Sequence, residues 1–322
     1  MKFRTEIELK KWSEPLEYSH QILCLGSCFA NTIADHLRRS KFRVVASPTG
    51  ILFNPASIAL AVRHMSKGYT PKNEDITELD GSYVNYNFHS QISAPTHDEL
   101  NAAVTTAIEQ GAEALRNADL TIITLGTAWV YRLRSTGEVV ANCHKQPQRL
   151  FSRELLTVDE CVVYLEEIVL STPSRLLLTV SPVRHIGEGL EDNSLSKAIL
   201  RVAIDIICRR HSDRVTYFPS FEMLVDDLRD YRFYADDLVH PSSKAVEYIV
   251  EKFYEAAISP STKATMERVQ AICAAVNHRP RNPHSEAYRE FCLRQLEAIN
   301  GLECVDLSQE RAAMERMLQI NL

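Results

Sequence analysis

The sequence predicts an α/β protein in which a parallel β-sheet is covered by helices on both faces. Short runs of aliphatic and β-branched residues alternate along the chain with longer amphipathic segments, which is the pattern of repeated β-α units. The short runs are apolar almost throughout, as "LTIITL" at 120–125 illustrates. Strands of that kind are buried on both sides of a sheet.

Each expected strand is a short apolar run, and each expected helix has apolar positions at helical spacing. The expected strands cover residues 21–25, 42–45, 120–125, 176–180 and 215–218. The expected helices cover residues 29–39, 55–64, 97–116, 157–170, 193–210 and 242–257. Before the third helix, Thr96 is a candidate N-cap, and Glu99 three residues later would complete a capping box.

Two regions interrupt the alternation of strands and helices. Residues 68–95 are expected to form an irregular insertion, with a hairpin as one option. Beyond residue 258 the pattern is helical without a strand candidate, and "NHRPRNPHS" at 277–285 separates two helices. We therefore expect an α/β domain of residues 1–258 and a C-terminal helical extension of residues 259–322. The apolar positions of the extension either pack on the core or form a homodimer contact; they include Tyr288, Phe291, Cys292, Leu296 and Ile299.

Composition and charge exclude several classes of function. Of the 322 residues, 45% are hydrophobic and 24% are charged, which is typical of a globular protein. The net charge of -6 is not gathered into runs, so we expect no nucleic-acid partner. The charged start "MKFRTEIELKKW" is unlike a signal peptide, and no window is long and apolar enough for a membrane span. We therefore expect a cytoplasmic protein.

Neither the cysteines nor the histidines have the spacing of a metal site. The eight cysteines show no zinc or disulfide pattern, which suits a reducing compartment. Four histidines, His89, His97, His144 and His185, lack both the i, i+4 and the H-x-H spacing of ligand pairs. No Gly-rich phosphate loop is present either, so we expect no metal and no cofactor.

The unusual residues of the sequence follow the expected strands. Ligands of doubly wound sheets bind at the carboxyl ends of the strands. There the sequence has "GSC" at 26–28, "SPTGILFNP" at 47–55, "GTAWVY" at 126–131 and "SPVRH" at 181–185. We expect all four segments to be loops around one site, with Trp129 in the pocket wall or stacked on a sugar ring.

The fifth strand leads to a second chemical signal, "YADDLVHPSSKA" at 234–245. Asp237 and His240 stand three residues apart just before a helix. This spacing lets the carboxylate accept a hydrogen bond from Nδ1 of His240, which leaves Nε2 in the tautomer of a general base. A nucleophile at the end of the first strand, either Ser27 or Cys28, would complete a triad. The preceding acidic stretch, 226–230, is expected to form a solvated turn.

At these residues the sequence resembles a known family. "GSCFA" at 26–30 is the motif that gives the GSCFA-domain family its name. "TLGTAWVY", "VVANCHKQP", "TVSPVRHIGEGLEDNSLSKAIL" and "DDLRDYRFYADDLVHPS" also look like that family. The resemblance covers residues of about 4–256.

The family is in turn similar to the SGNH or GDSL-type hydrolases, whose fold is a three-layer α/β/α flavodoxin-like arrangement. This second resemblance implies esterase, deacetylase or acyltransferase chemistry. The wider group's first motif reads Gly, Asp, Ser, Leu with serine as nucleophile. Over this chain Ser27 takes the aspartate position and Cys28 the nucleophile position. We favour Cys28, because neighbouring residues point in opposite directions, while Ser27 stays open. A helix N-terminus and a histidine should lower the pKa of the Cys28 thiol.

The chain departs from the wider group where an oxyanion hole is expected. The group's third motif supplies an asparagine, whereas 126–129 reads Gly-Thr-Ala-Trp. The resemblance then leaves the backbone N-H groups of Cys28 and Gly50 as donors, with Asn54 or Asn142 as a third. Gly126 belongs to the same region, and Arg184 and His185 are candidates for an anionic or polyol part of the substrate.

Three functions follow from the triad and the resemblance. The first is an acyl-ester hydrolase, an esterase or a deacetylase, which acts on a small-molecule or glycan ester. The second is an acyltransferase, which uses a cysteine nucleophile, a hydroxyl acceptor such as a sugar and an acyl-thioester donor. The third is a ligand-binding module without catalysis, which the missing asparagine favours and the Asp237-His240 pair opposes.

Overall fold

The computed structural model describes residues 5–187 and 189–319. The chain divides into two compact units. The first contains residues up to 8, 21–34 and 44–251. The second contains residues 9–20, 35–43 and 252 onward, so it takes in two N-terminal segments as well as the C-terminal helices.

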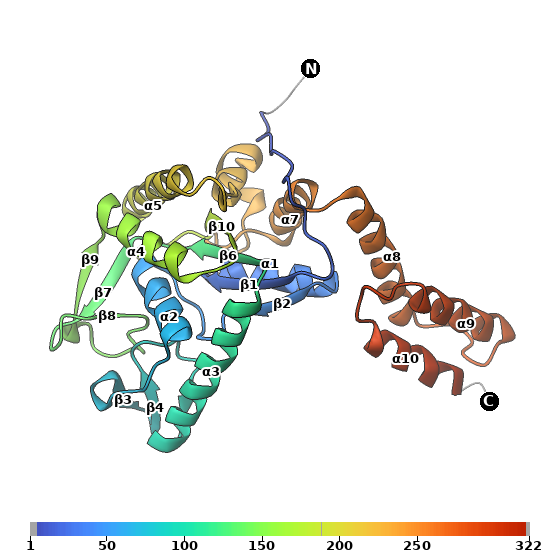
Figure 1. Cartoon of the computed structure of the whole chain (residues 1–322), viewed down its shortest axis with the longest axis horizontal. Helices are drawn as coiled ribbons and strands as arrows, with labels where there is room; N and C mark the ends of the chain where they lie inside the picture. Colours follow the sequence, from blue (N-terminus) through green and yellow to red (C-terminus); the bar gives the residue numbers. More distant parts are fainter. Residues whose placement is uncertain (1–4, 188, 320–322) are drawn as a thin grey trace. The chain divides into compact units, whose positions relative to one another are not determined.

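A five-stranded sheet is the centre of the first unit, as expected (Figure 1). Its order is β11-β10-β6-β1-β2, and β1, β6, β10 and β11 run parallel. The strands are β1 (Gln21–Gly26), β2 (Arg43–Ala46), β6 (Leu120–Leu125), β10 (Arg175–Val180) and β11 (Val215–Tyr217). All six residues of β6 are buried, because this strand has neighbours on both sides and helices on both faces.

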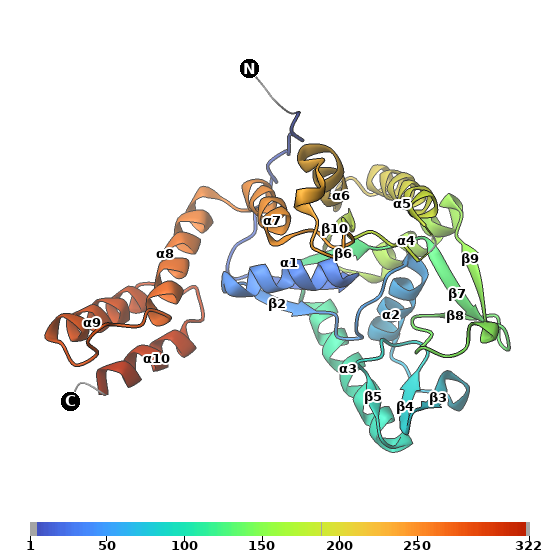
Figure 2. The ribbon, with the colours of Figure 1, turned by 180° about the vertical axis from the view of Figure 1, so that it is seen from behind.

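Helices cover both faces of the sheet, which gives the three layers that the sequence predicts (Figures 1 and 2). Side chains of alternate strand residues, such as Leu23, Leu25 and Ile123, form one core with the helices α2, α3, α4 and α5. Helices α1 and α7 lie on the other face (Figure 2). The bounds are α1 (Cys28–Arg39), α2 (Pro55–Lys67), α3 (His97–Asn117), α4 (Val158–Ser171), α5 (Leu190–Arg210) and α7 (Ser243–Ala257).

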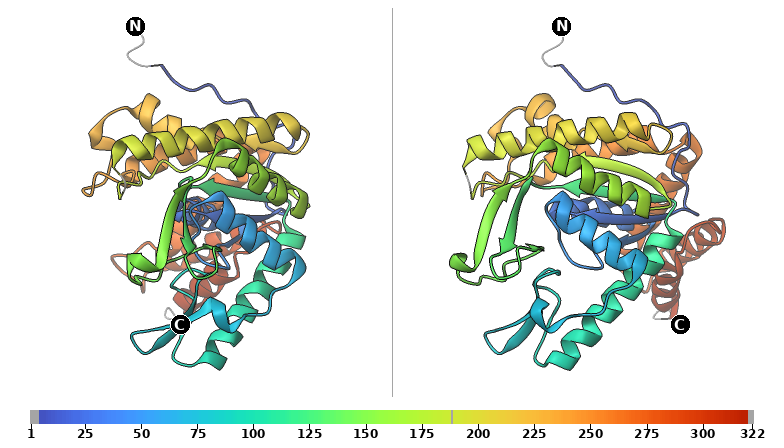
Figure 3. Two further views of the ribbon diagram at one scale, coloured as in Figure 1. Left: turned by 90° about the vertical axis from the view of Figure 1, so that its left-hand side faces the viewer. Right: turned by 60° about the vertical axis from the view of Figure 1, so that its left-hand side comes forward.

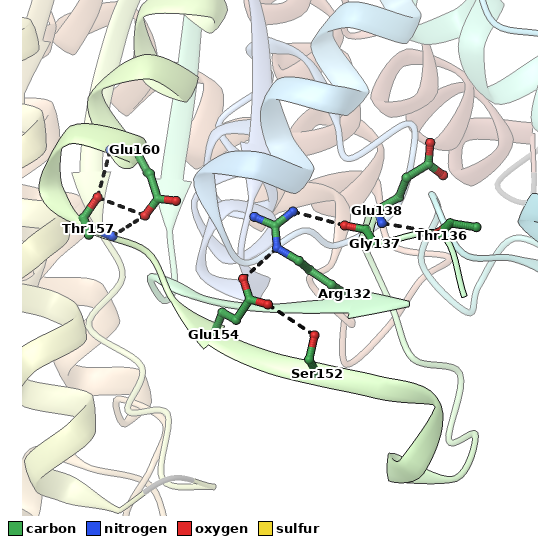
Figure 4. Close-up of polar contacts among 8 residues, drawn as sticks. All are labelled: Arg132, Thr136, Gly137, Glu138, Ser152, Glu154, Thr157 and Glu160. Atoms are coloured by element: carbon green, nitrogen blue, oxygen red, sulfur yellow. Dashed lines mark hydrogen bonds and ion pairs between the residues drawn. The ribbon is translucent and has the colours of Figure 1, made fainter. Parts of the chain in front are cut away.

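Capping side chains determine where several of these helices begin. Thr96 accepts a hydrogen bond from the N-H of Glu99 at the start of α3, as expected, and its hydroxyl donates to the Glu99 carboxylate. The complete capping box belongs to α4, where Thr157 and Glu160 each accept from the other's backbone N-H (Figure 4).

Two small antiparallel sheets extend the first unit (Figure 3). The insertion contains a hairpin of β3 (Ile76–Leu79) and β4 (Ser82–Asn85), and β5 (Ser93–Ala94) pairs with β4. A second sheet consists of β7 (Trp129–Leu133), β8 (Val139–Val140) and β9 (Phe151–Leu155). The prediction of a loop over 126–131 is wrong at its end, because Trp129, Tyr131 and Leu133 alternate with Val130 and Arg132 in β7.

The acidic stretch at 226–230 is also different from the expected solvated turn. It begins inside a π-helical segment (Met223–Leu228), and Asp227 is only 4% exposed. Its carboxylate accepts hydrogen bonds from the N-H of Ile7 at 3.0 Å and the hydroxyl of Tyr248 at 2.9 Å. Burial of this charge is possible because both oxygens have donors.

The second unit is helical with a core of its own. It contains α8 (Pro260–Val276), α9 (Glu286–Asn300) and α10 (Ser308–Gln319), and Leu16 forms a β-bridge to Ile258. Tyr288, Cys292 and Ile299 of α9 are buried within the protomer. A homodimer contact therefore stays a prediction. In the described part of the chain, every helix is too short or too polar to cross a bilayer.

Candidate active site

The first loop of the site begins at Gly26, where β1 ends. Gly26 has a φ of +120°, and a Cβ atom there would lie 2.2 Å from the carbonyl oxygen of Thr124 on β6. Only glycine fits a position this close to the neighbouring strand. The N-H of Ser27 donates to the same carbonyl at 2.9 Å, and α1 begins at the next residue, Cys28.

The structure separates the roles of Ser27 and Cys28. Ser27 is 1% exposed, and its hydroxyl has no partner among the described residues. Its carbonyl accepts from the N-H of Ala30, which places Ser27 at the N-terminus of α1. Cys28 is partly exposed, and its Sγ lies 3.9 Å from Nε2 of His240. Of the two neighbours, only the thiol therefore combines access from solvent with contact to the histidine.

Asp237 holds His240 from the side opposite to the thiol. Nδ1 of His240 lies 2.6 Å from Oδ2 of Asp237, while Oδ1 accepts the N-H groups of Val239 and His240, each at 2.9 Å. These hydrogen bonds lower the pKa of the Asp237 carboxyl to about 2. Because an ionised carboxylate only accepts, Nδ1 carries a proton, and in the neutral form of the ring Nε2 presents its lone pair to Cys28.

A tight turn gives the Asp237-His240 segment its shape. Leu238 has a positive φ of 57°, and the N-H of Ala235 donates to the carbonyl of His240 at 2.8 Å. Arg184 supports this turn from outside: its guanidinium lies 3.9 Å from the ring centroid of Tyr234 and donates to the carbonyl of Leu238. The structure thus places Arg184 against the turn, and its expected contact with a substrate stays a prediction.

The environment of Cys28 works in two directions on its thiol. Burial raises the pKa above its ordinary value. The N-H groups of Phe29 and of Cys28 itself and the charge of Lys197 oppose this effect without cancelling it. The expected lowering of the pKa is therefore wrong in sign, because desolvation of the thiolate outweighs the helix N-terminus. The thiol is protonated at neutral pH and needs a base to react.

The sequence analysis missed Lys197, a buried lysine of α5. Its side chain is 2% exposed, and Nζ donates to three carbonyl oxygens: Gly126 at 2.7 Å, Ser181 at 2.8 Å and Val183 at 3.0 Å. Burial lowers the pKa of Lys197 to about 7, and the nearby Cys28 thiolate would raise it. Three acceptors match the three N-H donors of the ammonium form.

One feature of the sequence would have identified Lys197 as unusual. It stands at a core position of α5, on the same buried stripe as Asn193, Ser196 and Leu200. A lysine at such a position needs partners, and the nearest carbonyl groups are those of the strand-end loops. Lys197 thus ties the loop after β6 to the loop after β10.

Most of the expected oxyanion donors are already engaged. The N-H of Gly50 donates to the carbonyl of Ser47 at 2.8 Å in a turn, so it is not available to an oxyanion. The N-H groups of Gly126 and Thr127 both donate to the carbonyl of Phe53, and that of Ala128 donates to Ser196. The N-H groups at the start of α1, which act on the Cys28 thiol, are the donors that remain beside it.

Several other expected residues line one pocket of about 670 Å³. Asn54 and Asn142 are among the lining residues, and Oδ1 of each accepts a backbone N-H, of Ser57 and His144 respectively. Trp129 and His185 also line this pocket. Among the described residues, no group of three or more His, Cys, Asp and Glu side chains is arranged to hold a metal ion.

These features define a class of protein: an α/β protein with a thiol, an imidazole and a carboxylate in line at the carboxyl edge of its parallel sheet. The chain belongs to the GSCFA family, whose model matches residues 21–253. The model of the GSCFA domain protein, C-terminal domain, matches residues 269–320. A search of curated proteins found no match.

Proposed function

We propose that this protein is an acyl-transfer enzyme that cleaves an ester or thioester through a covalent intermediate on Cys28. The observation that carries the proposal is the line of three groups, with Sγ of Cys28 at 3.9 Å from Nε2 of His240 and Nδ1 at 2.6 Å from Asp237. A base oriented in this way towards a thiol has no evident use in a module that only binds a ligand.

In the first step, Nε2 of His240 accepts the thiol proton while Sγ attacks the acyl carbonyl carbon. A C-S bond forms, and the carbonyl electron pair moves to an oxyanion beside the N-H groups at the start of α1. The intermediate collapses as the bond to the leaving group breaks, and the imidazolium returns its proton to that group. Asp237 stays ionised throughout and stabilises the imidazolium, because its pKa is about 2.

In the second step, His240 deprotonates an acceptor hydroxyl, whose oxygen attacks the S-acyl carbonyl carbon. The C-S bond then breaks, and the imidazolium returns its proton to the leaving sulfur of Cys28, which restores the thiol. Water as acceptor makes the protein an esterase or deacetylase, which is the function we propose first. A sugar hydroxyl makes it an acyltransferase. Two observations favour this second candidate: a sulfur nucleophile, which suits exchange with thioester donors, and a pocket large enough for an acceptor.

Lys197 acts on this chemistry through position and charge. By joining the carbonyls of Gly126, Ser181 and Val183, it sets the loops that flank the nucleophile. Its positive charge also favours the thiolate form of Cys28. We assign Lys197 as a positioning residue, since its three donors are used by the protein.

The proposal is tested by trapping the acyl-enzyme. The protein is mixed briefly with p-nitrophenyl acetate, quenched in acid and analysed by mass spectrometry of its peptides. We expect an acetyl group on the peptide that contains Cys28, and its loss in Cys28→Ala and His240→Gln. Cys304→Ala, which removes an exposed thiol, is the matched control and should leave the adduct unchanged. Acetylation of Cys304 with none at Cys28 would contradict the proposal and favour a ligand-binding module.

A further inference from the structure

The pocket beside the site has a charge unlike that of the chain. Three cationic side chains line it, those of Arg134, Lys145 and Arg153, and its described lining contains no carboxylate. The whole chain carries more acidic residues than basic ones, 42 against 36. The charged side chains of the described pocket wall are all basic, which favours an anionic ligand. Arg134 and Lys145 are exposed at the wall, where a ligand can reach them.

The same wall carries aromatic rings. Tyr131 and Arg153 are cross-strand partners on β7 and β9, and Leu133 pairs with Phe151. With Trp129 these odd-numbered residues share one face of the sheet, because side chains alternate along a strand. The guanidinium of Arg153 lies 4.3 Å from the centroid of the Trp129 ring. The buried indole N-H of Trp129 has no partner among the described residues.

The opposite face of the same strands is electrically balanced (Figure 4). There Nε of Arg132 lies 2.7 Å from the carboxylate of Glu154, and a second nitrogen of Arg132 donates to the carbonyl of Gly137. The hydroxyl of Ser152 donates to the other oxygen of Glu154. Among the described residues, the carboxylate of Glu154 thus lies on the face opposite to the pocket, while Arg153 of the same strand lies on the pocket face.

The inner end of the pocket belongs to the strand-end loops. Asn54 follows β2, Thr127 follows β6 and His185 follows β10, and all three line the pocket. Cys28 follows β1, the neighbour of β6, at the same edge of the sheet. The pocket thus shares the strand-end edge of the sheet with the thiol, while Cys28 and His240 themselves are not among its described lining residues.

We propose that this pocket binds the substrate through an anionic group, a phosphate or a carboxylate, attached to a ring or chain that packs on Trp129 and Tyr131. Guanidinium and ammonium groups bind both kinds of oxyanion, and aromatic faces bind sugar and nucleobase rings. The volume of about 670 Å³ suits one small organic molecule. The proposal rests on the proposed function only in calling that molecule the substrate.

The binding experiment makes use of the two tryptophans of the chain. In Trp12→Phe, all tryptophan fluorescence comes from Trp129 in the pocket wall. This variant also carries Cys28→Ala, so that binding is measured without acyl transfer. Four probes are titrated: coenzyme A against pantetheine, which lacks the phosphates, and glucuronate against glucose, which lacks the carboxylate.

We expect at least one anionic probe to change the fluorescence with saturation, and its neutral counterpart to bind about tenfold more weakly or not at all. Binding of coenzyme A would mean that the pocket binds the phosphate groups of an acyl donor. Binding of glucuronate would mean that it binds the carboxylate of a sugar substrate. Arg134→Gln with Lys145→Gln should weaken anion binding by about tenfold. The matched control Arg132→Gln, on the balanced face, should change it by less than about twofold.

Equal binding of charged and neutral probes would overturn the proposal, as would no binding of either anion or unchanged affinity in the double variant. These results are distinct from failure of the proposed function, because acetylation of Cys28 by p-nitrophenyl acetate does not need the basic wall. If the pocket binds anions but Cys28 is not acetylated, the proposed binding site would stand and the proposed acyl-transfer activity would be contradicted.

Discussion

His240 and Lys197 are the two basic residues that we propose to act on Cys28, and their surroundings differ strongly. The side chain of His240 is 51% exposed and is held by one carboxylate on a surface turn. Lys197 is 2% exposed and is held by three backbone carbonyls inside the protein. An exposed imidazole can exchange protons and move at little cost to the fold. A buried lysine with three backbone partners is part of the fold itself. In the mechanism that we propose, the same thiol therefore depends on one group for chemistry and on another for position and charge.

The largest effect should come from His240. In His240→Gln, hydrolysis of p-nitrophenyl acetate should fall by about 10³-fold, because the thiol stays protonated without a base. The free energy of unfolding should change by less than about 0.5 kcal/mol, since the side chain is exposed. Steady-state rates and urea denaturation measure the two quantities. If His240→Gln lowered the free energy of unfolding as much as Lys197→Met does, His240 would be a structural residue like Lys197, which would contradict this prediction.

Lys197→Met should instead act first on stability. Three buried carbonyls lose their donor, at a total cost of about 3 kcal/mol or more in the free energy of unfolding. Urea denaturation followed by circular dichroism measures this loss. Lys244→Met, at an exposed position of α7, is the matched control and should be near neutral. An unchanged midpoint in Lys197→Met would show that the loops do not depend on the ammonium group.

The smallest effect is electrostatic. The rate of iodoacetamide alkylation at Cys28 should increase with pH. The midpoint of this pH profile should lie above that of an ordinary cysteine, because burial raises the pKa of the thiol. In Lys197→Met the midpoint should move upward only slightly, because the pKa of Lys197 is about 7 and the lysine carries little charge at the pH where the thiol titrates. Peptide mass spectrometry at a series of pH values follows both. A midpoint below the ordinary value would mean that the helix N-terminus dominates after all.

The sequence predicts most of the central fold because the signals are local. Apolar runs and helical spacing predict five strands and six helices, and the structure has each of them with small shifts at the ends. The sheet of β7, β8 and β9 was missed because its strands are short and only partly buried, so none of them forms a continuous apolar run. Trp129 was expected in the pocket wall and does line it, but on a strand instead of a loop.

By itself the sequence predicted which segments follow the strands, that the first strand ends at Gly26 just before Cys28, and that Asp237 can orient His240. Asp237 and His240 are only three positions apart in the sequence, so they lie close together wherever this segment folds. Only the tertiary structure decided that Ser27 is buried while Cys28 meets His240, a contact across 212 positions. It also decided the sign of the Cys28 pKa shift, the role of Lys197 and the basic wall of the pocket. Burial, desolvation and a cage of carbonyls depend on residues that only folding brings together.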